Sequence, residues 1–175
     1  MSVRKKFTIV LLLLASFVAF LVTGALAPIA YEDSKQESFT DRPIEIWANA
    51  ADIELIPRRR PEVESIVILF VGERGEVTWR ENLKNGSTRM KRILSRSAPN
   101  YLSVEQFESS YGITGTWEFV LQQVGDATVV TINEKSTNMN LWLRAYYTII
   151  GRNILIDREF KSLRVSLFQR LITTD

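Results

Sequence analysis

The chain has 175 residues, enough for one membrane anchor and one domain of ordinary size, and it contains neither cysteine nor histidine. These absences exclude disulfides, thiolate nucleophiles and cysteine-ligated metals and remove the commonest general base, so we predict no catalytic residue, metal site or cofactor. Arg4, Lys5 and Lys6 contribute +3 to the net charge of +2, which leaves −1 for residues 31–175 and gives them no electrostatic footprint for nucleic acid.

An uncharged apolar run, Phe7–Ala30, follows the short basic segment Met1–Lys6. As a helix this run spans about 36 Å, enough for the ~30 Å hydrocarbon core of a bilayer. We therefore expect residues 1–30 to be a transmembrane anchor and residues 31–175 to form the domain. The basic residues on the N-terminal side put the N-terminus in the cytoplasm, so we expect a single-pass protein whose domain lies on the outer (periplasmic or extracytoplasmic) side.

A cleaved secretory signal is the competing interpretation of the same segment. The small residues of a cleavage site are offered by Ala25-Leu26-Ala27. However, Pro28 follows this site directly, and the apolar run is longer than a usual signal core. A retained anchor is the favoured prediction, and both interpretations place the domain beyond the membrane.

Short elements precede the main strands. Residues 31–40 are polar and indicate either an exposed first strand or a tether. Asp41 as an N-cap, with Pro43 in the first turn, predicts a short amphipathic helix that begins there. A second helical turn is predicted over residues 52–56, stopped by Pro57, and residues 58–60 form the exit loop.

Six strand-like runs separated by turn signals come next. Asn85-Gly86, a strong hairpin signal, separates the second run from the third. Because tight turns join consecutive runs, the sequence predicts an antiparallel meander. The runs are residues 64–71, 76–83, 87–95, 101–109, 116–122 and 128–134.

The periodicity becomes helical after Ser136. Residues 139–150 and 153–171 read as helices, interrupted at Gly151. An apolar stripe runs along them and is expected to lie on the open face of the sheet. It consists of Ile149, Ile156, Phe160, Leu163, Leu167 and Leu171.

Local motifs accompany this order of elements. They are Ile44–Trp47, Ala50, Asp52–Glu54, Pro57, Arg60–Ile66, Gly115–Phe119, Thr128–Glu134 and Ile156–Leu163. Together, the order and the motifs resemble the SRPBCC superfamily (START / polyketide cyclase-dehydrase-like, helix-grip fold) over residues 34–171. One departure is that Arg58-Arg59-Arg60 stands where the family often has a second tryptophan after the proline.

The resemblance implies an α+β fold in which a curved antiparallel sheet of about seven strands wraps a long C-terminal helix. It also implies an apolar cavity between sheet and helix. Members of the superfamily bind lipids, sterols or polyketides, and a minority cyclise or dehydrate them. A hydrophobic small molecule or lipid is therefore the expected partner, beside the membrane reached through residues 7–30.

Aromatic and aliphatic side chains on the predicted strands and helices are the candidate cavity wall. The alternative is that they simply fill the core. We expect a predominantly apolar wall whose mouth opens near residues 58–60 and Gly151. The predicted lining is Trp79, Trp117, Phe119, Leu121, Tyr146, Ile149, Ile156, Phe160 and Leu163, with Trp142 and Tyr147 as further aromatic candidates.

Two sets of charged residues have both a functional and a plain interpretation. Arg58, Arg59 and Arg60 either contact anionic lipid headgroups at the membrane surface or form a solvated loop. A second set on the strands either projects inward as proton donors and acceptors or lies on the wet face, and the spacing singles out no pair. This set is Glu81, Arg89, Glu105, Glu118 and Glu134.

Three functions are therefore open. The favoured one is a membrane-anchored module that binds a lipid or other hydrophobic molecule in an internal cavity. The alternatives are a polyketide cyclase/dehydrase-like enzyme on the same scaffold and an anchored interaction protein without a ligand. An enclosed volume separates the first two from the third.

Overall fold

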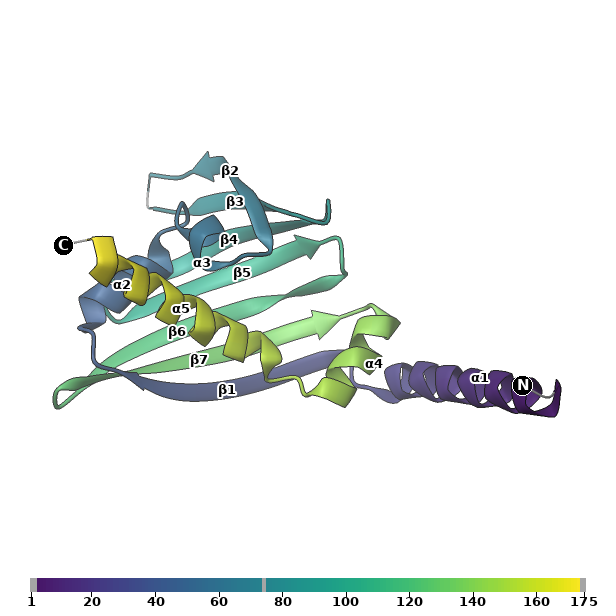
Figure 1. The fold of residues 1–175 in the computed structure, drawn as a ribbon. Helices are drawn as coiled ribbons and strands as arrows, with labels where there is room; N and C mark the ends of the chain where they lie inside the picture. The colour runs from purple at the N-terminus through teal and green to yellow at the C-terminus, as the bar shows by residue number, and fades with distance from the viewer. Residues whose placement is uncertain (1–2, 74, 174–175) are drawn as a thin grey trace.

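The structure, a computed structural model, describes residues 3–73 and 75–173, with side chains over residues 4–73 and 75–168. It has the predicted α+β architecture, in which one antiparallel sheet is covered on its concave face by helices (Figure 1). The elements in chain order are α1 (Val3–Leu26), β1 (Ala30–Phe39), α2 (Pro43–Ala51), α3 (Ile56–Arg59), β2 (Val63–Val71), β3 (Val77–Leu83), β4 (Thr88–Ser97), β5 (Tyr101–Ser109), β6 (Ile113–Val124), β7 (Ala127–Asn138), α4 (Leu141–Ile150) and α5 (Ile154–Thr173).

The sheet has seven strands in the order β1-β7-β6-β5-β4-β3-β2, and all neighbouring strands pair antiparallel. The predicted meander from β2 to β7 is confirmed. Gly86, with φ of 82°, allows the tight turn between β3 and β4 that Asn85-Gly86 predicted. Of residues 31–40, all but Thr40 belong to a strand, β1, which pairs with β7 along its whole length and forms one edge of the sheet.

The two short helices cross from one edge of the sheet to the other, and their ends differ from the prediction. Arg42, not Asp41, caps α2, because its backbone N–H donates to Glu45 Oε2 at 3.1 Å. Pro57 does not stop the next helix but lies in the first turn of α3, where its missing N–H costs nothing. The turn between α2 and α3 is held by Asp52, whose Oδ1 accepts a hydrogen bond from the backbone N–H of Glu54 at 3.0 Å.

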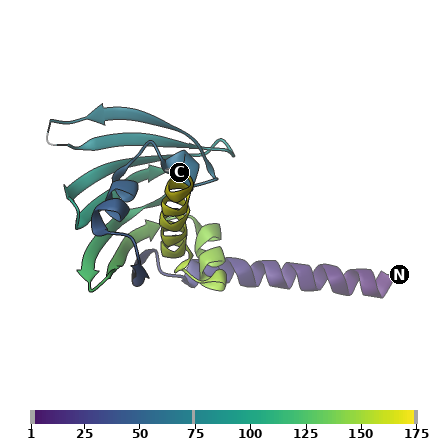
Figure 2. The same ribbon diagram turned by 60° about the vertical axis from the view of Figure 1, so that its left-hand side comes forward.

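Helix α5 lies lengthwise in the concave face of the sheet (Figure 2), as predicted. Four residues of the predicted stripe lie on α5 and are buried in one core cluster with residues from strands β1 to β7. They are Ile156, Phe160, Leu163 and Leu167. Ile149 is 63% exposed, so its place in the stripe was wrong. Gly151, with φ of 94°, breaks the helix and turns α4 away from the sheet. The Leu171 side chain lies outside the described residues.

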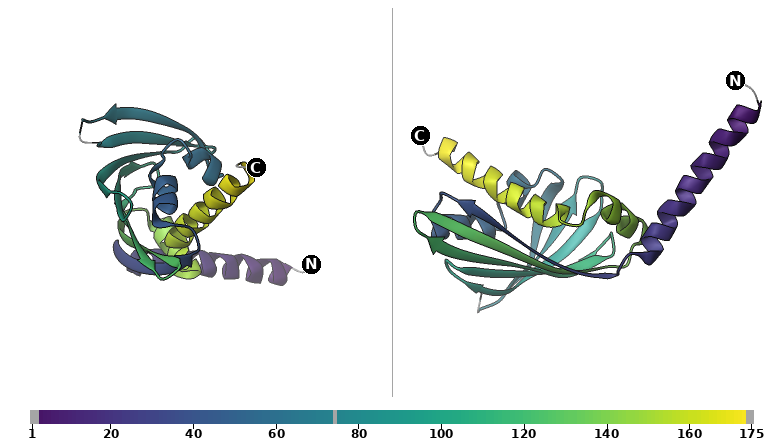
Figure 3. Two further views of the ribbon diagram at one scale, coloured as in Figure 1. Left: turned by 90° about the vertical axis from the view of Figure 1, so that its left-hand side faces the viewer. Right: turned by 90° about the horizontal axis from the view of Figure 1, so that it is seen from below.

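Helix α1 projects away from the domain and packs against α4 at its C-terminal end (Figure 3). In the described part of the chain it is the single helix long and apolar enough to cross a membrane, over Arg4–Leu26; an N-terminal signal sequence meets the same test. Its last turns contact α4. The Trp142 ring lies 5.6 Å from that of Phe17 and 5.8 Å from that of Phe20. Gly24 lies so close to Leu141 that an added Cβ would be 2.3 Å from its carbonyl oxygen.

Candidate functional site

A cleft of about 760 Å³ opens between the sheet and the two C-terminal helices. Its volume falls in the range of small-molecule sites, about 300–1,000 Å³. Strands β3 to β6 form its floor, while α4, α5 and the end of α3 form its walls. The lining residues are Arg59, Arg60, Pro61, Glu62, Leu83, Lys84, Asn85, Arg89, Lys91, Gln106, Ser109, Tyr111, Ile113, Trp117, Leu143, Tyr146, Tyr147, Leu155, Arg158, Glu159, Lys161, Ser162 and Val165.

A smaller cavity of about 40 Å³ continues from the cleft into the core. The two spaces share a wall, formed by Arg59, Arg60, Lys91, Trp117, Glu159 and Ser162. The inner cavity has room for one or two waters or a small group, on the scale of about 30 Å³ of liquid volume per water. Its other walls are mainly apolar side chains of the strands, of α5 and of the segment after α2, including Trp79, Leu102, Phe119, Leu163 and Ile53.

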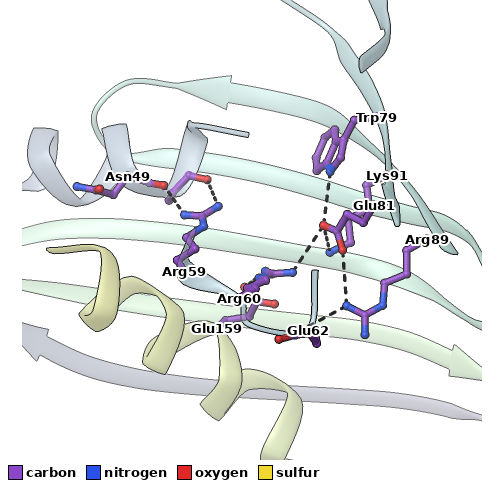
Figure 4. Close-up of polar contacts among 10 residues, drawn as sticks. Asn49, Arg59, Arg60, Glu62, Trp79, Glu81, Arg89, Lys91 and Glu159 are labelled. Carbon is purple, nitrogen blue, oxygen red and sulfur yellow. Dashed lines mark hydrogen bonds and ion pairs between the residues drawn. The ribbon is translucent and has the colours of Figure 1, made fainter. Parts of the chain in front are cut away.

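A buried carboxylate, Glu81, stands where the two spaces meet, with three cations around it (Figure 4). Lys91 Nζ is 3.0 Å from Glu81 Oε1 and Arg60 Nη1 is 3.7 Å from the same oxygen. Arg89 Nη1 is 3.6 Å from Glu81 Oε2. The Trp79 indole donates a long hydrogen bond to Glu81 Oε1 at 3.5 Å. Alternation on β3 and β4 turns Glu81, Arg89 and Lys91 to the same concave face.

The environment sets the charge of each group in this cluster. Burial alone would raise the pKa of Glu81, but Lys91, Arg60 and Arg89 outweigh it and lower that pKa to about 2. Burial lowers the pKa of Lys91 to about 8, and the attraction of Glu81 offsets this only in part because Arg60 and Arg89 repel the ammonium. Glu81 is therefore ionised at neutral pH, and Lys91 exchanges its proton near that range.

Arg59 and Arg60 are part of the domain interior. The Arg59 guanidinium donates to the carbonyl oxygens of Asn49 and Ala50, and burial together with Arg60 lowers its pKa to about 10. Arg60 donates to the carboxylate of Glu159. These hydrogen bonds hold both side chains inside, so the membrane-surface contact predicted for three arginines is wrong for these two. Of the three, only Arg58 is exposed.

The predicted cavity residues divide into three groups. Trp79, Trp117, Phe119 and Leu163 line the inner cavity, while Trp117 and Tyr146 line the cleft together with Tyr147. A second group is buried in the core away from both spaces: Leu121, Ile156 and Phe160. Ile149 and Trp142 are on exposed faces of α4, at 63% and 50%.

Apolar atoms make up most of the surface of the cleft wall, but the wall also contains many charged groups. Nine of its lining residues are charged. They are tolerated because several pair with one another and the cleft is open to water. The cleft does run between the two places predicted for its mouth, from Arg59 and Arg60 to α4, which ends at Gly151.

The five charged strand residues also divide between the two faces of the sheet. Glu81, Arg89 and Glu134 face inward, and Glu134 is fully buried beneath α5. Glu105 and Glu118 face the other side, where Arg92 donates to Glu105 at 2.5 Å and the Tyr101 hydroxyl donates to Glu118 at 3.0 Å. Burial raises the pKa of Glu134 to about 7, opposed by the hydrogen bond from Ser136.

Lys91 and Glu159 are site residues that the sequence interpretation did not assign to the cleft, and Arg60 was predicted only near its mouth. Lys91 lies two residues from both Arg89 and Ile93 on β4, so the three side chains share one face of the strand. Ile93 is buried, and this period of two was the signal for an inward lysine. Glu159 lies one residue before Phe160 on α5 and turns toward Arg60. Among the described residues, no group of three or more acidic side chains is placed to hold a metal ion.

No family model and no curated protein sequence matches the chain. Solved structures do match its fold. The aromatase/cyclase Zhui from Streptomyces sp. R1128 is similar over 80% of this chain and 93% of its own, with a TM-score of 0.64 and 13% identity. A START superfamily protein from Mycobacterium smegmatis covers 78% of this chain and 98% of its own, with a TM-score of 0.61 and 15% identity.

A protein from Thermus thermophilus gives a similar match, with a TM-score of 0.63 and 14% identity, over 83% of this chain and 99% of its own. These likenesses and the helix-gripping sheet show that the chain has the helix-grip fold of these aromatase/cyclase and START superfamily structures. At such identities they establish the fold and carry over no activity.

Proposed function

We propose that the chain is a membrane-anchored binding module that holds a hydrophobic small molecule or lipid in the cleft. The observation that carries the proposal is that a single helix, α4, serves both the cleft and the anchor. Leu143, Tyr146 and Tyr147 of α4 line the cleft, while Trp142 and Ala145 of the same helix pack on α1. If α1 spans a bilayer, the cleft therefore opens beside it.

The exposed side of α4 supports this placement. Trp142, Tyr146, Ile149 and Ile150 are all at least 42% exposed on a ten-residue helix. Tryptophan and tyrosine are enriched where a membrane meets water, and an amphipathic helix there buries its apolar face at the headgroup boundary. The basic N-terminal segment supports a cytoplasmic N-terminus, with the domain on the outer side.

The experiment is to block the cleft without disturbing the fold. Val165 lies on α5 and lines the cleft, so Val165→Trp adds bulk to open space. Phe168→Trp is the matched control, because Phe168 is on the same helix, 65% exposed and outside the cleft wall. Full-length protein in lipid nanodiscs should bind a neutral apolar fluorophore above the level of empty nanodiscs. Val165→Trp should lose this binding, the control should keep it, and equal binding by both would refute the proposal.

Catalysis on the same scaffold is a second candidate, favoured by one observation. Lys91 lines the cleft, and its pKa of about 8 lets it exchange a proton near neutral pH. However, its neighbour Glu81 is kept ionised by three cations, which leaves no paired acid at this point. Turnover of a polyketide-type substrate that Lys91→Met abolishes, with substrate binding retained, would favour catalysis over binding alone.

An interaction protein is the third candidate, and the edge strand β2 favours it. Five consecutive apolar residues, Val67–Val71, are exposed on this strand. Open apolar edges pair readily with other chains. If this is the main function, charged substitutions on β2 should abolish activity in cells, while Val165→Trp should not.

A further inference from the structure

The cleft described above has an excess of positive charge. Seven of its lining residues are basic and two are acidic. Glu81 of the inner cavity adds one more negative charge where the two spaces meet. A wholly neutral ligand would leave this excess partly desolvated and unbalanced, which is costly in a confined site.

The basic residues differ in how far their donors are already used. Arg59 donates to two backbone carbonyls, and Arg60 is shared between Glu159 and Glu81. Arg89, in contrast, has only long ion pairs, 3.6 Å to Glu81 and 4.0 Å to Glu62, and no hydrogen bond within residues 4–73 and 75–168. Its side chain is only 19% exposed. The five N–H donors of the Arg89 guanidinium therefore make no hydrogen bond to the described residues and remain available to a ligand.

Two further donors lie near Arg89. The Lys91 ammonium has one ion pair among the described residues, with Glu81 at 3.0 Å, and Lys91 lines both the cleft and the inner cavity. Tyr147 also lines the cleft, and its hydroxyl makes no hydrogen bond to the described residues. Burial raises the pKa of Tyr147, and the charges of Arg158 and Arg89 oppose that increase, so its hydroxyl keeps its proton at neutral pH. Tyr147 is thus a neutral donor beside the cations.

The rest of the wall suits an apolar chain. Ile113, Trp117, Leu143, Tyr146, Leu155 and Val165 belong to it. Three of these residues come from α4 or from the turn of α5 that follows it, which is the end of the cleft nearest α1. The cationic donors Arg89 and Lys91 come instead from β4, while the third donor, Tyr147, lies on α4.

We propose that the cleft takes an amphiphile with an anionic head group, a carboxylate or a phosphate, which Arg89 and Lys91 hold with help from Tyr147. The apolar tail lies against Trp117 and the residues of α4. Arginine and lysine form their strongest hydrogen bonds with such oxyanions, and a partly buried site strengthens them. This inference rests on the proposed function and specifies its ligand class.

The test compares cis-parinaric acid, a fluorescent carboxylate amphiphile, with its neutral methyl ester. Full-length protein in nanodiscs is titrated with each probe, and energy transfer from tryptophan is recorded; loss of transfer in Trp117→Phe identifies the part that comes from the cleft. Wild-type protein should bind the acid at least tenfold more tightly than the ester, a difference of about 1.4 kcal/mol. Equal affinities would overturn the inference and leave the proposed function standing, whereas binding of neither probe would overturn both.

Variants of β4 provide the second arm. Arg89→Met should remove the preference for the acid and leave the ester affinity within twofold. Arg92→Met is the matched control, because Arg92 is an exposed arginine of the same strand that pairs with Glu105 on the other face. An unchanged preference in Arg89→Met, or equal losses in both variants, would refute the role of Arg89.

The third arm separates two sources of the anion. Dodecyl phosphate should displace cis-parinaric acid, and inorganic phosphate at the same concentration should not. Displacement by inorganic phosphate alone would mean that the site takes a free anion, which would overturn the amphiphile.

Discussion

Glu134 should make the domain less stable as the pH rises from about 4.5 to 7. Its side chain is fully buried on β7; Ser136 Oγ donates to one carboxylate oxygen at 2.7 Å, and the other oxygen, Oε2, has no hydrogen-bond partner among the described residues. Burial raises the pKa of Glu134 from 4.5 to about 7. The folded state therefore holds this proton over a range in which the unfolded chain has lost it.

The sign and size of the effect follow from proton linkage. Between the two pKa values the folded state binds more protons than the unfolded state, so the free energy of unfolding falls with increasing pH. At about 1.4 kcal/mol per pH unit, the loss amounts to roughly 3 kcal/mol by pH 8. Glu134→Gln keeps the shape and removes the ionisation, so the variant should be more stable than wild type by up to that amount at pH 8. Near pH 4.5 the two proteins should differ little.

Urea unfolding at pH 5 and pH 8, followed by near-ultraviolet circular dichroism of the detergent-solubilised protein, measures this difference. Glu118→Gln is the control, because Glu118 lies on the opposite face of the sheet, away from the buried site of Glu134. If the stability difference between Glu134→Gln and wild type were the same at both pH values, Glu134 would titrate as an ordinary exposed carboxylate and the reasoning would be refuted.

The remaining predictions concern the core and the anchor. Phe160→Ala and Leu163→Ala should each lower the free energy of unfolding by about 2–5 kcal/mol in urea titrations, since both side chains are buried beneath the sheet; changes near zero at both would contradict the packing of α5. Gly24→Leu should separate α1 from α4 and expose the α4 backbone to faster hydrogen exchange, whereas Ala25→Leu, at an exposed neighbour, should not. Trp142 fluorescence in nanodiscs should be quenched by lipids brominated on their acyl chains, and an unquenched signal would place α4 away from the bilayer.

The sequence predicted the fold because the pattern of apolar residues and turn residues was consistent along the chain. Alternation on the strands, the Asn85-Gly86 turn and the stripe on α5 each required an antiparallel meander covered by a C-terminal helix. The prediction was wrong where it extended the stripe across Gly151 to Ile149. Helical periodicity alone does not show that a glycine between two helices changes the direction of the chain.

The site was predicted only in part, because its chemistry depends on burial that periodicity does not report. Charged residues on strands usually face water, so Glu81 and Arg89 were assigned two alternatives and Lys91 none. The structure turns all three inward, where each charge tolerates burial because the others are present. This compensation depends on the distances between three side chains in the folded sheet. The order of residues along the chain does not give those distances.

Native mass spectrometry of the full-length protein released from lipid nanodiscs tests most directly whether the cleft holds a hydrophobic molecule. We predict a population heavier than the bare chain by the mass of one small molecule or lipid, present in wild type and in Phe168→Trp and lost in Val165→Trp. A bound mass that persists unchanged in Val165→Trp, or wild-type protein that appears only at the mass of the bare chain after incubation with apolar ligands, would contradict a ligand-binding cleft.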